Sequence, residues 1–297
     1  MTGDPLTLLD LERETAAPMV LLAEGAFGRG ELRRRASAMA RRLEAAGAAG
    51  GDVIVSLDAG PGFVAALAGC WIAGATPVLL DPLVRDEIES ALAVTGARAV
   101  IRGTPAGAGE PGGGVPNLAP DEGERAARPA PPIAADAAVV RLYTSGSTGA
   151  PALISKRRAH LEVEVEFLAG LFGAPRRVAN LVPWCHIYGF LFSLLLPLRA
   201  GGTCDLSAGI SPRAALLRAA AGEVDLLVAV PAIYRVLVRL LELDRSIAIP
   251  AGCSFSSAGA RLTAELRERF AAITGRPIVD VYGSTQAGGI AYREADG

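Results

Sequence analysis

Four short segments combine glycine with hydroxyl, amide or aromatic side chains, and each follows an apolar run. They are 143–151 (YTSGSTGAP), 183–189 (PWCHIYG), 256–261 (SSAGAR) and 282–289 (YGSTQAGG). Glycine lets backbone N–H groups come close to an anion because it has no Cβ to hold the ligand away. The first segment therefore predicts a binding site for nucleotide phosphates, although a Ser/Thr/Gly loop by itself is also typical of a plain turn.

The elements that must position these segments alternate between short β-rich runs and longer amphipathic runs. We predict strands at 53–57, 77–80, 98–101, 138–142, 177–182, 225–230, 253–257 and 277–282. We predict helices at 31–46, 62–73, 86–94, 157–172, 187–198, 212–221, 232–241 and 263–273. The near-continuous apolar strands indicate parallel sheets covered on both faces, so the fold class is α/β. Ligands of such sheets bind at the carboxyl ends of the strands, and we expect all four segments on such an edge.

Composition excludes several classes of protein. With 297 residues, 51% of them hydrophobic, the chain can bury a large core and form two domains. A formal charge of −2 and an aromatic content of 5% argue against a nucleic-acid partner. The acidic start MTGDPLTLLDLERE lacks the features of a signal peptide, and the apolar stretch 189–198 is too short to span a bilayer. We expect a cytoplasmic protein with no membrane segment, in which 189–198 is a buried helix.

The cysteines do not predict a metal site. They lie far apart in the sequence without a CxxC pair, and the chain has only two histidines. We expect reduced thiols in the core at Cys70, Cys185, Cys204 and Cys253.

One stretch, 103–136, interrupts the alternation of strands and helices. It is rich in Gly, Pro and Ala and has no usable hydrophobic period. We expect an exposed, mobile connection, after which the strand at 138–142 rejoins the sheet that 53–57 began.

Taken together and in this order, the four segments resemble the motifs of the adenylate-forming (AMP-binding) superfamily, which includes acyl-CoA synthetases, aryl-CoA ligases and the adenylation domains of peptide synthetases. Segment 143–151 looks like its phosphate-binding loop, 183–189 like its acid-pocket segment, 256–261 like its adenine-proximal loop, and 282–289 like its YGxTE motif. The resemblance covers 51–292 well and the first fifty residues loosely. HIYG before an apolar helix, Lys156 and the helix LEVEVEFL are most similar to small aryl or acyl AMP-ligases.

The resemblance implies the N-terminal core of that superfamily, built from two interlocked, doubly wound parallel-sheet subdomains. Subdomain A would span roughly 51–195, including the flexible 103–136, and subdomain B roughly 196–292 with 1–46 packed on it. The family's ribose-binding aspartate, its hinge and its C-terminal lid with a catalytic lysine would lie beyond Gly297 and are absent from this chain. We therefore expect inefficient acyl transfer by the chain alone.

The resemblance also assigns roles to individual residues. Those that would bind the ATP phosphates are Thr144, Ser145, Gly146, Ser147, Thr148 and Gly149. Those that would contact adenine or adjoin it are Ala258, Gly259, Ala260, Tyr282, Gly283 and Ser284, with Tyr282 stacked on the base. Thr285 would donate to the α-phosphate. His186 would orient the acid, although a lone histidine beside apolar residues is also typical of a core or surface side chain. Trp184, Tyr188 and Phe190 would line the same cavity or belong to the core.

Two residues depart from the family's pattern. Pro151 is followed by Ala152 where the family commonly has lysine, and Lys156 is the nearest ammonium that can replace it. Gln286 stands where a glutamate usually coordinates Mg²⁺, and an amide offers the metal an oxygen without a charge. We expect weakened metal affinity.

The predicted function is that of an AMP-forming acid–thiol ligase with ATP and Mg²⁺ as cofactors. Its partners would be a small aryl or acyl carboxylic acid and the thiol of CoA or of an acyl carrier protein's phosphopantetheine. The alternative is a non-catalytic adenylate-binding or scaffolding homologue, which Gln286 and the expected lack of the lid favour and the intact phosphate loop opposes. A serine hydrolase is excluded because the sequence has no GxSxG motif.

Overall fold

The structure, a computed structural model, describes residues 2–3, 8–9, 11, 13, 15–84, 87–103, 115–119, 126–144 and 152–293. The chain divides into two compact units. The first contains Met1–Ala16 and Phe27–Val163, and the second contains Ala17–Ala26 and Glu164–Gly297. The division therefore falls within helix α4 (Arg158–Phe172).

The first unit is built on a six-stranded sheet with the order β10-β9-β5-β4-β6-β7. Its strands are β4 (Asp52–Ser56), β5 (Thr76–Leu79), β6 (Ala99–Arg102), β7 (Asn117–Leu118), β9 (Ala138–Thr144) and β10 (Ala152–Arg157). β10 is antiparallel to β9, and the other neighbours are parallel. The helices are α1 (Arg29–Ala45), α2 (Pro61–Ile72) and α3 (Glu87–Thr95), and a separate two-stranded sheet pairs β1 (Thr2–Gly3) with β8 (Ile133–Ala134).

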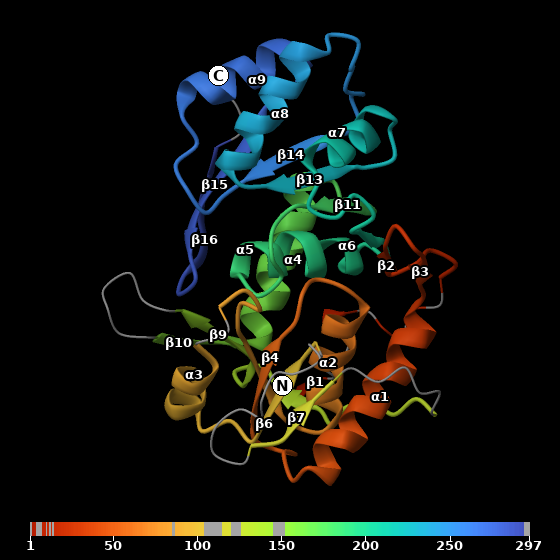
Figure 1. Cartoon of the computed structure of the whole chain (residues 1–297), viewed down its shortest axis with the longest axis vertical. Coiled ribbons are helices and arrows are strands. Elements are labelled where there is room, and N and C mark those ends of the chain that lie inside the picture. The colour runs from red at the N-terminus through yellow and green to blue at the C-terminus, as the bar shows by residue number, and fades with distance from the viewer. Residues whose placement is uncertain are drawn as a thin grey trace. The chain divides into compact units, whose positions relative to one another are not determined.

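The second unit is built on an eight-stranded sheet with the order β16-β15-β14-β13-β11-β12-β2-β3. Its strands are β2 (Val20–Leu21), β3 (Ala26–Phe27), β11 (Arg177–Asn180), β12 (Thr203–Asp205), β13 (Leu226–Ala229), β14 (Ser254–Ser257), β15 (Ile278–Ser284) and β16 (Gly288–Arg293). Its remaining helical elements are α5 (Ile187–Gly189), the π-helical segment η2 (Phe190–Leu195), α6 (Leu196–Arg199), α7 (Pro212–Ala220), α8 (Pro231–Leu243) and α9 (Ala264–Thr274). Figure 1 shows α7, α8 and α9 on one face of this sheet and α5 and α6 on the other.

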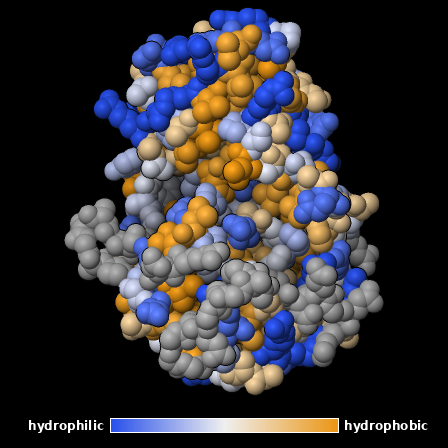
Figure 2. All heavy atoms as spheres, in the orientation of Figure 1, coloured by the Kyte–Doolittle hydropathy of each residue, from blue (hydrophilic) through white to orange (hydrophobic). Residues whose placement is uncertain are grey.

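Aromatic packing organises the core beneath α7, α8 and α9. The Phe270 ring lies edge-on to Phe255 at 4.8 Å and to Tyr234 at 5.5 Å between centroids. The Tyr234 hydroxyl donates to the Ser256 carbonyl over 2.9 Å, so its polar atom is satisfied inside the core. The outer surfaces of α8 and α9 carry charged side chains, and Figure 2 shows hydrophilic residues gathered there at the top of the view.

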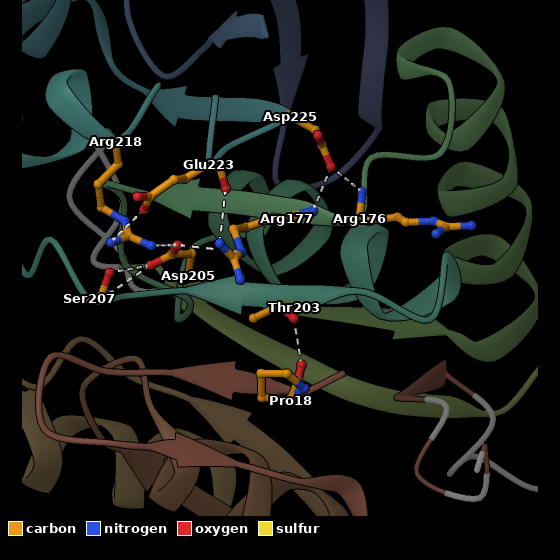
Figure 3. A network of polar contacts seen from close by, with 9 residues as sticks. All are labelled: Pro18, Arg176, Arg177, Thr203, Asp205, Ser207, Arg218, Glu223 and Asp225. Carbon is orange, nitrogen blue, oxygen red and sulfur yellow. Dashed lines mark hydrogen bonds and ion pairs between the residues drawn. The ribbon is translucent and has the colours of Figure 1, made fainter. Parts of the chain in front are cut away.

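A buried carboxylate ties β12 to α7 at the far side of the same sheet. Asp205 is 1% exposed and accepts from Arg218 over 2.8 Å and from the Ser207 hydroxyl over 2.6 Å. Nearby, Asp225 accepts from the backbone N–H groups of Arg176 and Arg177, each over 2.9 Å (Figure 3). The Asp225 bonds join the start of β11 to the residue before β13, 48 and 49 positions further along the chain, and the Asp205 bond to Arg218 joins β12 to α7.

The α/β fold class is confirmed, and the sheets follow the predicted strands. The predicted connection of 138–142 to the sheet of 53–57 is also confirmed, because β9 pairs with β5 and β5 with β4. The sequence missed the antiparallel edge strands β10 and β16, which follow glycine-containing segments and lack a long apolar run. It also missed the two- and three-residue strands β2, β3, β7 and β12. Within 103–136, the described residues include β7 and β8, so part of that stretch is paired rather than a plain connection.

The two units differ from the subdomains expected from the sequence. The division at Val163 and Glu164 comes earlier than the expected boundary near 195, and α1 belongs to the first unit rather than to the second. The reason for the latter is close helix packing, because a Cβ at Gly69 of α2 would come within 2.7 Å of the Met39 side chain of α1.

The four cysteines are free and buried, which confirms the expectation of core thiols. Burial raises the pKa of the Cys253 thiol to about 12 and that of Cys70 further. The segment 189–198 is a buried helical stretch, as expected. Among the described residues, no helix has both the length and the apolar character needed to cross a membrane.

Candidate functional site

Three of the four chemical segments meet at one edge of the eight-stranded sheet. β11, β13, β14 and β15 are parallel neighbours, so the segments that follow β11, β14 and β15 leave from the same carboxyl edge. The fourth segment follows β9, which belongs to the other sheet, and the expectation of a single edge for all four is wrong on this point. Its residues Ser145, Gly146, Ser147, Thr148 and Gly149 lie outside the described part of the chain, as does the side chain of Thr144.

A cavity of about 410 Å³ opens at this carboxyl edge. Its volume is within the range typical of small-molecule sites. Seven residues predicted from the sequence line it: His186, Tyr188, Ala258, Gly259, Gly283, Ser284 and Thr285. Its remaining walls are mostly apolar and include Val182, Leu191, Phe192, Val230 and Val281. The tertiary structure thus brings residues from three separate segments to one apolar hollow with a few polar groups.

The position of His186 follows from a tight turn between β11 and α5. The His186 N–H donates to the Pro183 carbonyl over 3.4 Å, and His186 then caps α5 with an extended backbone. Gly189 allows the helix to lie against the turn, since a Cβ there would come within 2.1 Å of the Pro183 carbonyl oxygen. The exposed His186 side chain is therefore held at the mouth of the cavity by backbone geometry.

The three aromatic residues of this segment separate into two groups. Trp184 and Phe190 are 1% and 0% exposed and belong to the core. Tyr188 lines the cavity, and its hydroxyl donates to the Ser256 Oγ over 2.9 Å while its ring packs 4.8 Å from that of Phe192. Burial raises the pKa of Tyr188 well above its ordinary value, so this hydroxyl stays protonated and acts as a hydrogen-bond donor rather than as a base.

The β15–β16 hairpin forms the opposite wall. A Cβ at Gly283 would meet the Gly288 carbonyl oxygen at 2.3 Å, and Gly288 itself has a φ of +78°, a conformation that glycine adopts readily. The Ser284 Oγ accepts from the Ala287 N–H over 3.1 Å and closes the turn. Thr285 is half-buried in the turn, and Gln286 is exposed on it.

Among the cavity residues that sequence reasoning did not identify is a charged one, Glu164 of α4. Its Oε1 accepts from the Gly289 N–H over 2.7 Å, and the residue lines the cavity. The segment LEVEVEFL places glutamates at 162, 164 and 166, and an alternating series on a helix does not indicate which of them faces a site. Glu162 and Glu166 instead pair with Arg158 and Arg199, respectively.

A second cavity of about 620 Å³ adjoins the first and shares Gly259, Val281 and Gly283 with it. Ala260 and Tyr282, both predicted from the sequence to contact adenine, line this second cavity. The Tyr282 side chain is 69% exposed, so its ring face is open to a planar ligand.

Three of the residues that line the second cavity are charged. Asp280, Arg261 and Arg293 line it. Burial raises the pKa of Asp280, and the charges of Arg293 and Arg267 partly offset that effect. An aromatic platform beside hydrogen-bonding and cationic groups suits a nucleoside with a phosphate attached.

One predicted catalytic residue lies elsewhere. Lys156 is on β10 in the first unit, where its side chain is 5% exposed and its backbone pairs opposite Val140. Its assignment as the replacement for the family's loop lysine stays a prediction.

The geometry agrees with the result of a comparison with known families. Residues 20–297 match the family described as AMP-binding enzyme. The chain belongs to this family. The match confirms the resemblance that the four sequence segments indicate.

Individual relatives include ligases of several acids. A 4-coumarate–CoA ligase of Halorhodospira halophila is 38% identical over 152 residues, which are 51% of this chain. A feruloyl-CoA synthase of Amycolatopsis is 29% identical over 276 residues, which are 86% of this chain. A solved malonyl-CoA ligase with methylmalonyl-CoA and AMP bound superimposes on 98% of this chain with a TM-score of 0.84 and 25% identity.

The chain spans only part of each of these proteins. It corresponds to 37% of the coumarate ligase, 54% of the feruloyl-CoA synthase and 63% of the solved malonyl-CoA ligase. The comparisons establish the family and the fold of the described units.

Proposed function

We propose that this chain binds ATP and a small carboxylic acid and joins them as an acyl-AMP, whose acyl group then passes to the thiol of CoA. The observation that carries the proposal is the pair of cavities with a common wall at the carboxyl edge of the second unit's sheet. One is apolar and suits the body of an acid, and the other has the open Tyr282 ring and suits adenine.

The common wall suits the chemistry. With the nucleoside against Tyr282 and the acid in the first cavity, the two reactants meet at Gly283, where no side chain separates them. A carboxylate oxygen then forms a bond to the α-phosphorus, and the bond from that phosphorus to the bridging oxygen of pyrophosphate breaks. In this proposal Thr285 donates a hydrogen bond to the phosphate and His186 orients the carboxylate; both residues line the first cavity.

In the second step, the sulfur of CoA attacks the acyl carbonyl and loses its proton, and AMP leaves. The names of the relatives support CoA as the acceptor. A carrier-protein thiol would undergo the same reaction, and we propose it as the second acceptor to test.

The turn that carries Gln286 offers Mg²⁺ neutral oxygen donors, the Gln286 amide and the Thr285 hydroxyl. These donors fit a metal held chiefly by the phosphates of the nucleotide. When bound there, Mg²⁺ would neutralise negative charge on the phosphates.

Calorimetric titration of the chain with ATP and AMP tests the nucleotide site. Tyr282→Ala should weaken binding about tenfold to hundredfold, because stacking on an aromatic side chain typically contributes 1–3 kcal/mol per base. Ile210→Ala is the matched control, since Ile210 is 95% exposed and lines neither cavity. Equal ATP affinity in both variants and the wild type would contradict the assignment of the second cavity.

Acid-dependent release of pyrophosphate then separates a ligase from a non-catalytic homologue. Release that requires both ATP and a carboxylic acid supports the proposal. Tight ATP binding without pyrophosphate release over a broad panel of acids favours the scaffolding alternative.

A further inference from the structure

The first cavity contains a half-buried carboxylate, that of Glu164, which the proposed reaction does not use. Glu164 projects from α4 to the wall formed by β16, where it accepts from the Gly289 N–H over 2.7 Å. A Cβ at Gly288 would come within 2.5 Å of the Glu164 Oε2, so the glycine lets the carboxylate lie directly against the hairpin.

Glu164 and His186 mark opposite sides of the cavity. The loop of His186 follows β11, whereas Glu164 bonds to β16, and the sheet order places β13, β14 and β15 between those two strands. An acid whose carboxylate lies near His186 therefore directs its other end toward Glu164.

The side chains that line the cavity limit which chemical groups the end of the acid remote from its carboxylate can carry. The walls between the two residues are largely apolar, and no Lys or Arg is among the described residues that line the cavity. A carboxylate accepts about four hydrogen bonds, and the Gly289 N–H supplies one. Glu164 can therefore accept a bond from a hydroxyl, whereas a second anionic group would meet a like charge without a cation to balance it.

We propose that Glu164 determines the specificity of the acid site. It accepts a hydrogen bond from a hydroxyl at the end of the acid remote from the carboxylate, and it excludes acids that carry a second anion there. The substrate class is thus a monocarboxylic acid with a flat or extended apolar body and a distal hydroxyl. This inference rests on the proposed function.

The contacts of Tyr292 show the reach of this carboxylate. Tyr292 packs against Phe167 with 5.3 Å between ring centroids. Burial raises the pKa of Tyr292 to about 12, and the negative charge of Glu164 adds to the effect.

A purely structural role for Glu164 makes a different prediction. If Glu164 only held the β15–β16 hairpin in place, its replacement would change the affinity for all acids by the same factor. Glu164→Gln separates the two roles, because the amide oxygen keeps an acceptor for the Gly289 N–H while the charge is lost. Glu166→Gln on the same helix is the matched control, since Glu166 is 67% exposed and does not line the cavity.

The test measures the dissociation constants of 4-coumarate, cinnamate and 4-carboxycinnamate by calorimetry with AMP at saturation. These three acids share one body and end in a hydroxyl, a hydrogen and a second carboxylate. The wild type should bind 4-coumarate about tenfold to hundredfold more tightly than cinnamate, the usual effect of a hydrogen bond to a charged group. Glu164→Gln should reduce that ratio to a few-fold and bind 4-carboxycinnamate at least about tenfold better than the wild type does. The pair 4-hydroxybenzoate and benzoate repeats the comparison with a shorter body.

The outcomes distinguish this inference from the proposed function. If AMP binds and pyrophosphate release depends on an acid, but the wild type and Glu164→Gln show the same ratios, the role of Glu164 is refuted and the ligase proposal stands. If AMP binds and none of the hydroxy acids does, the inference is refuted as well. If neither nucleotide nor acid binds, both proposals fail.

Discussion

Replacing Gly189 by alanine should disrupt the acid cavity by forcing two of its walls apart. Gly189 has a helical φ of −63°, so alanine introduces no backbone strain, and in an open helix it would stabilise the fold by roughly 0.5–1 kcal/mol. Here the new Cβ would lie 2.1 Å from the Pro183 carbonyl oxygen, whereas ordinary contact begins at 3.4 Å. The two segments must separate by about 1.3 Å, the difference between those distances.

The cost of that separation can be set against the gain in helix propensity. The obstructing atom belongs to the backbone and has no rotamer to change, so the clash must be relieved by movement of the turn or of α5. Overpacking of this kind typically costs about 1–3 kcal/mol. We therefore expect a net destabilisation of roughly 1–2 kcal/mol, with a loss of acid binding because Pro183 and Gly189 both line the cavity.

Gly170→Ala is the matched control. Gly170 is an exposed residue of α4, and a Cβ there would meet nothing within 4 Å. Urea denaturation should show that Gly189→Ala lowers the free energy of unfolding, whereas Gly170→Ala leaves it unchanged or raises it. A Gly189→Ala protein as stable as Gly170→Ala, with wild-type affinity for the acid, would refute the packing argument.

Three further predictions concern charge. Gln286→Glu should strengthen the Mg²⁺ dependence of ATP binding because it adds a charged oxygen ligand, and titration of Mg²⁺ at fixed ATP checks it. Asp280→Asn should stabilise the protein at neutral pH. Because the fold raises the pKa of Asp280, the native state binds more protons than the unfolded state between about pH 3.8 and the raised pKa. The free energy of unfolding of the wild type therefore falls as the pH rises through that range. Thermal unfolding between pH 3 and 8 should show the advantage of the variant vanish at low pH. Asp205→Asn should lower the free energy of unfolding by about 2 kcal/mol, because the Arg218 guanidinium loses its buried partner. Glu166→Gln removes a charge from an exposed pair and should change that free energy by less than about 0.5 kcal/mol. Similar urea midpoints for these two variants would contradict the contrast.

The sequence by itself determined the α/β alternation and the segments that carry the site. Strand and helix periods are local properties, so each predicted strand and helix corresponds to an observed element within a few residues, except that the helix predicted at 187–198 consists of α5, η2 and α6. The order of the four glycine-containing segments identified the family, because each motif is contiguous and needs no knowledge of tertiary contacts.

Only the tertiary structure decided which side chains share a cavity. Tyr188 faces the hollow while Trp184 and Phe190 lie in the core, a division set by the packing of a three-residue helix and a π-helical segment. Glu164 is more than a hundred residues from Gly289, to which it bonds. Its role depends on an antiparallel edge strand, β16, whose short glycine-rich sequence gives no long hydrophobic pattern. Contacts of this kind form between elements that are far apart in the sequence, so the periodicity of a single segment cannot predict them.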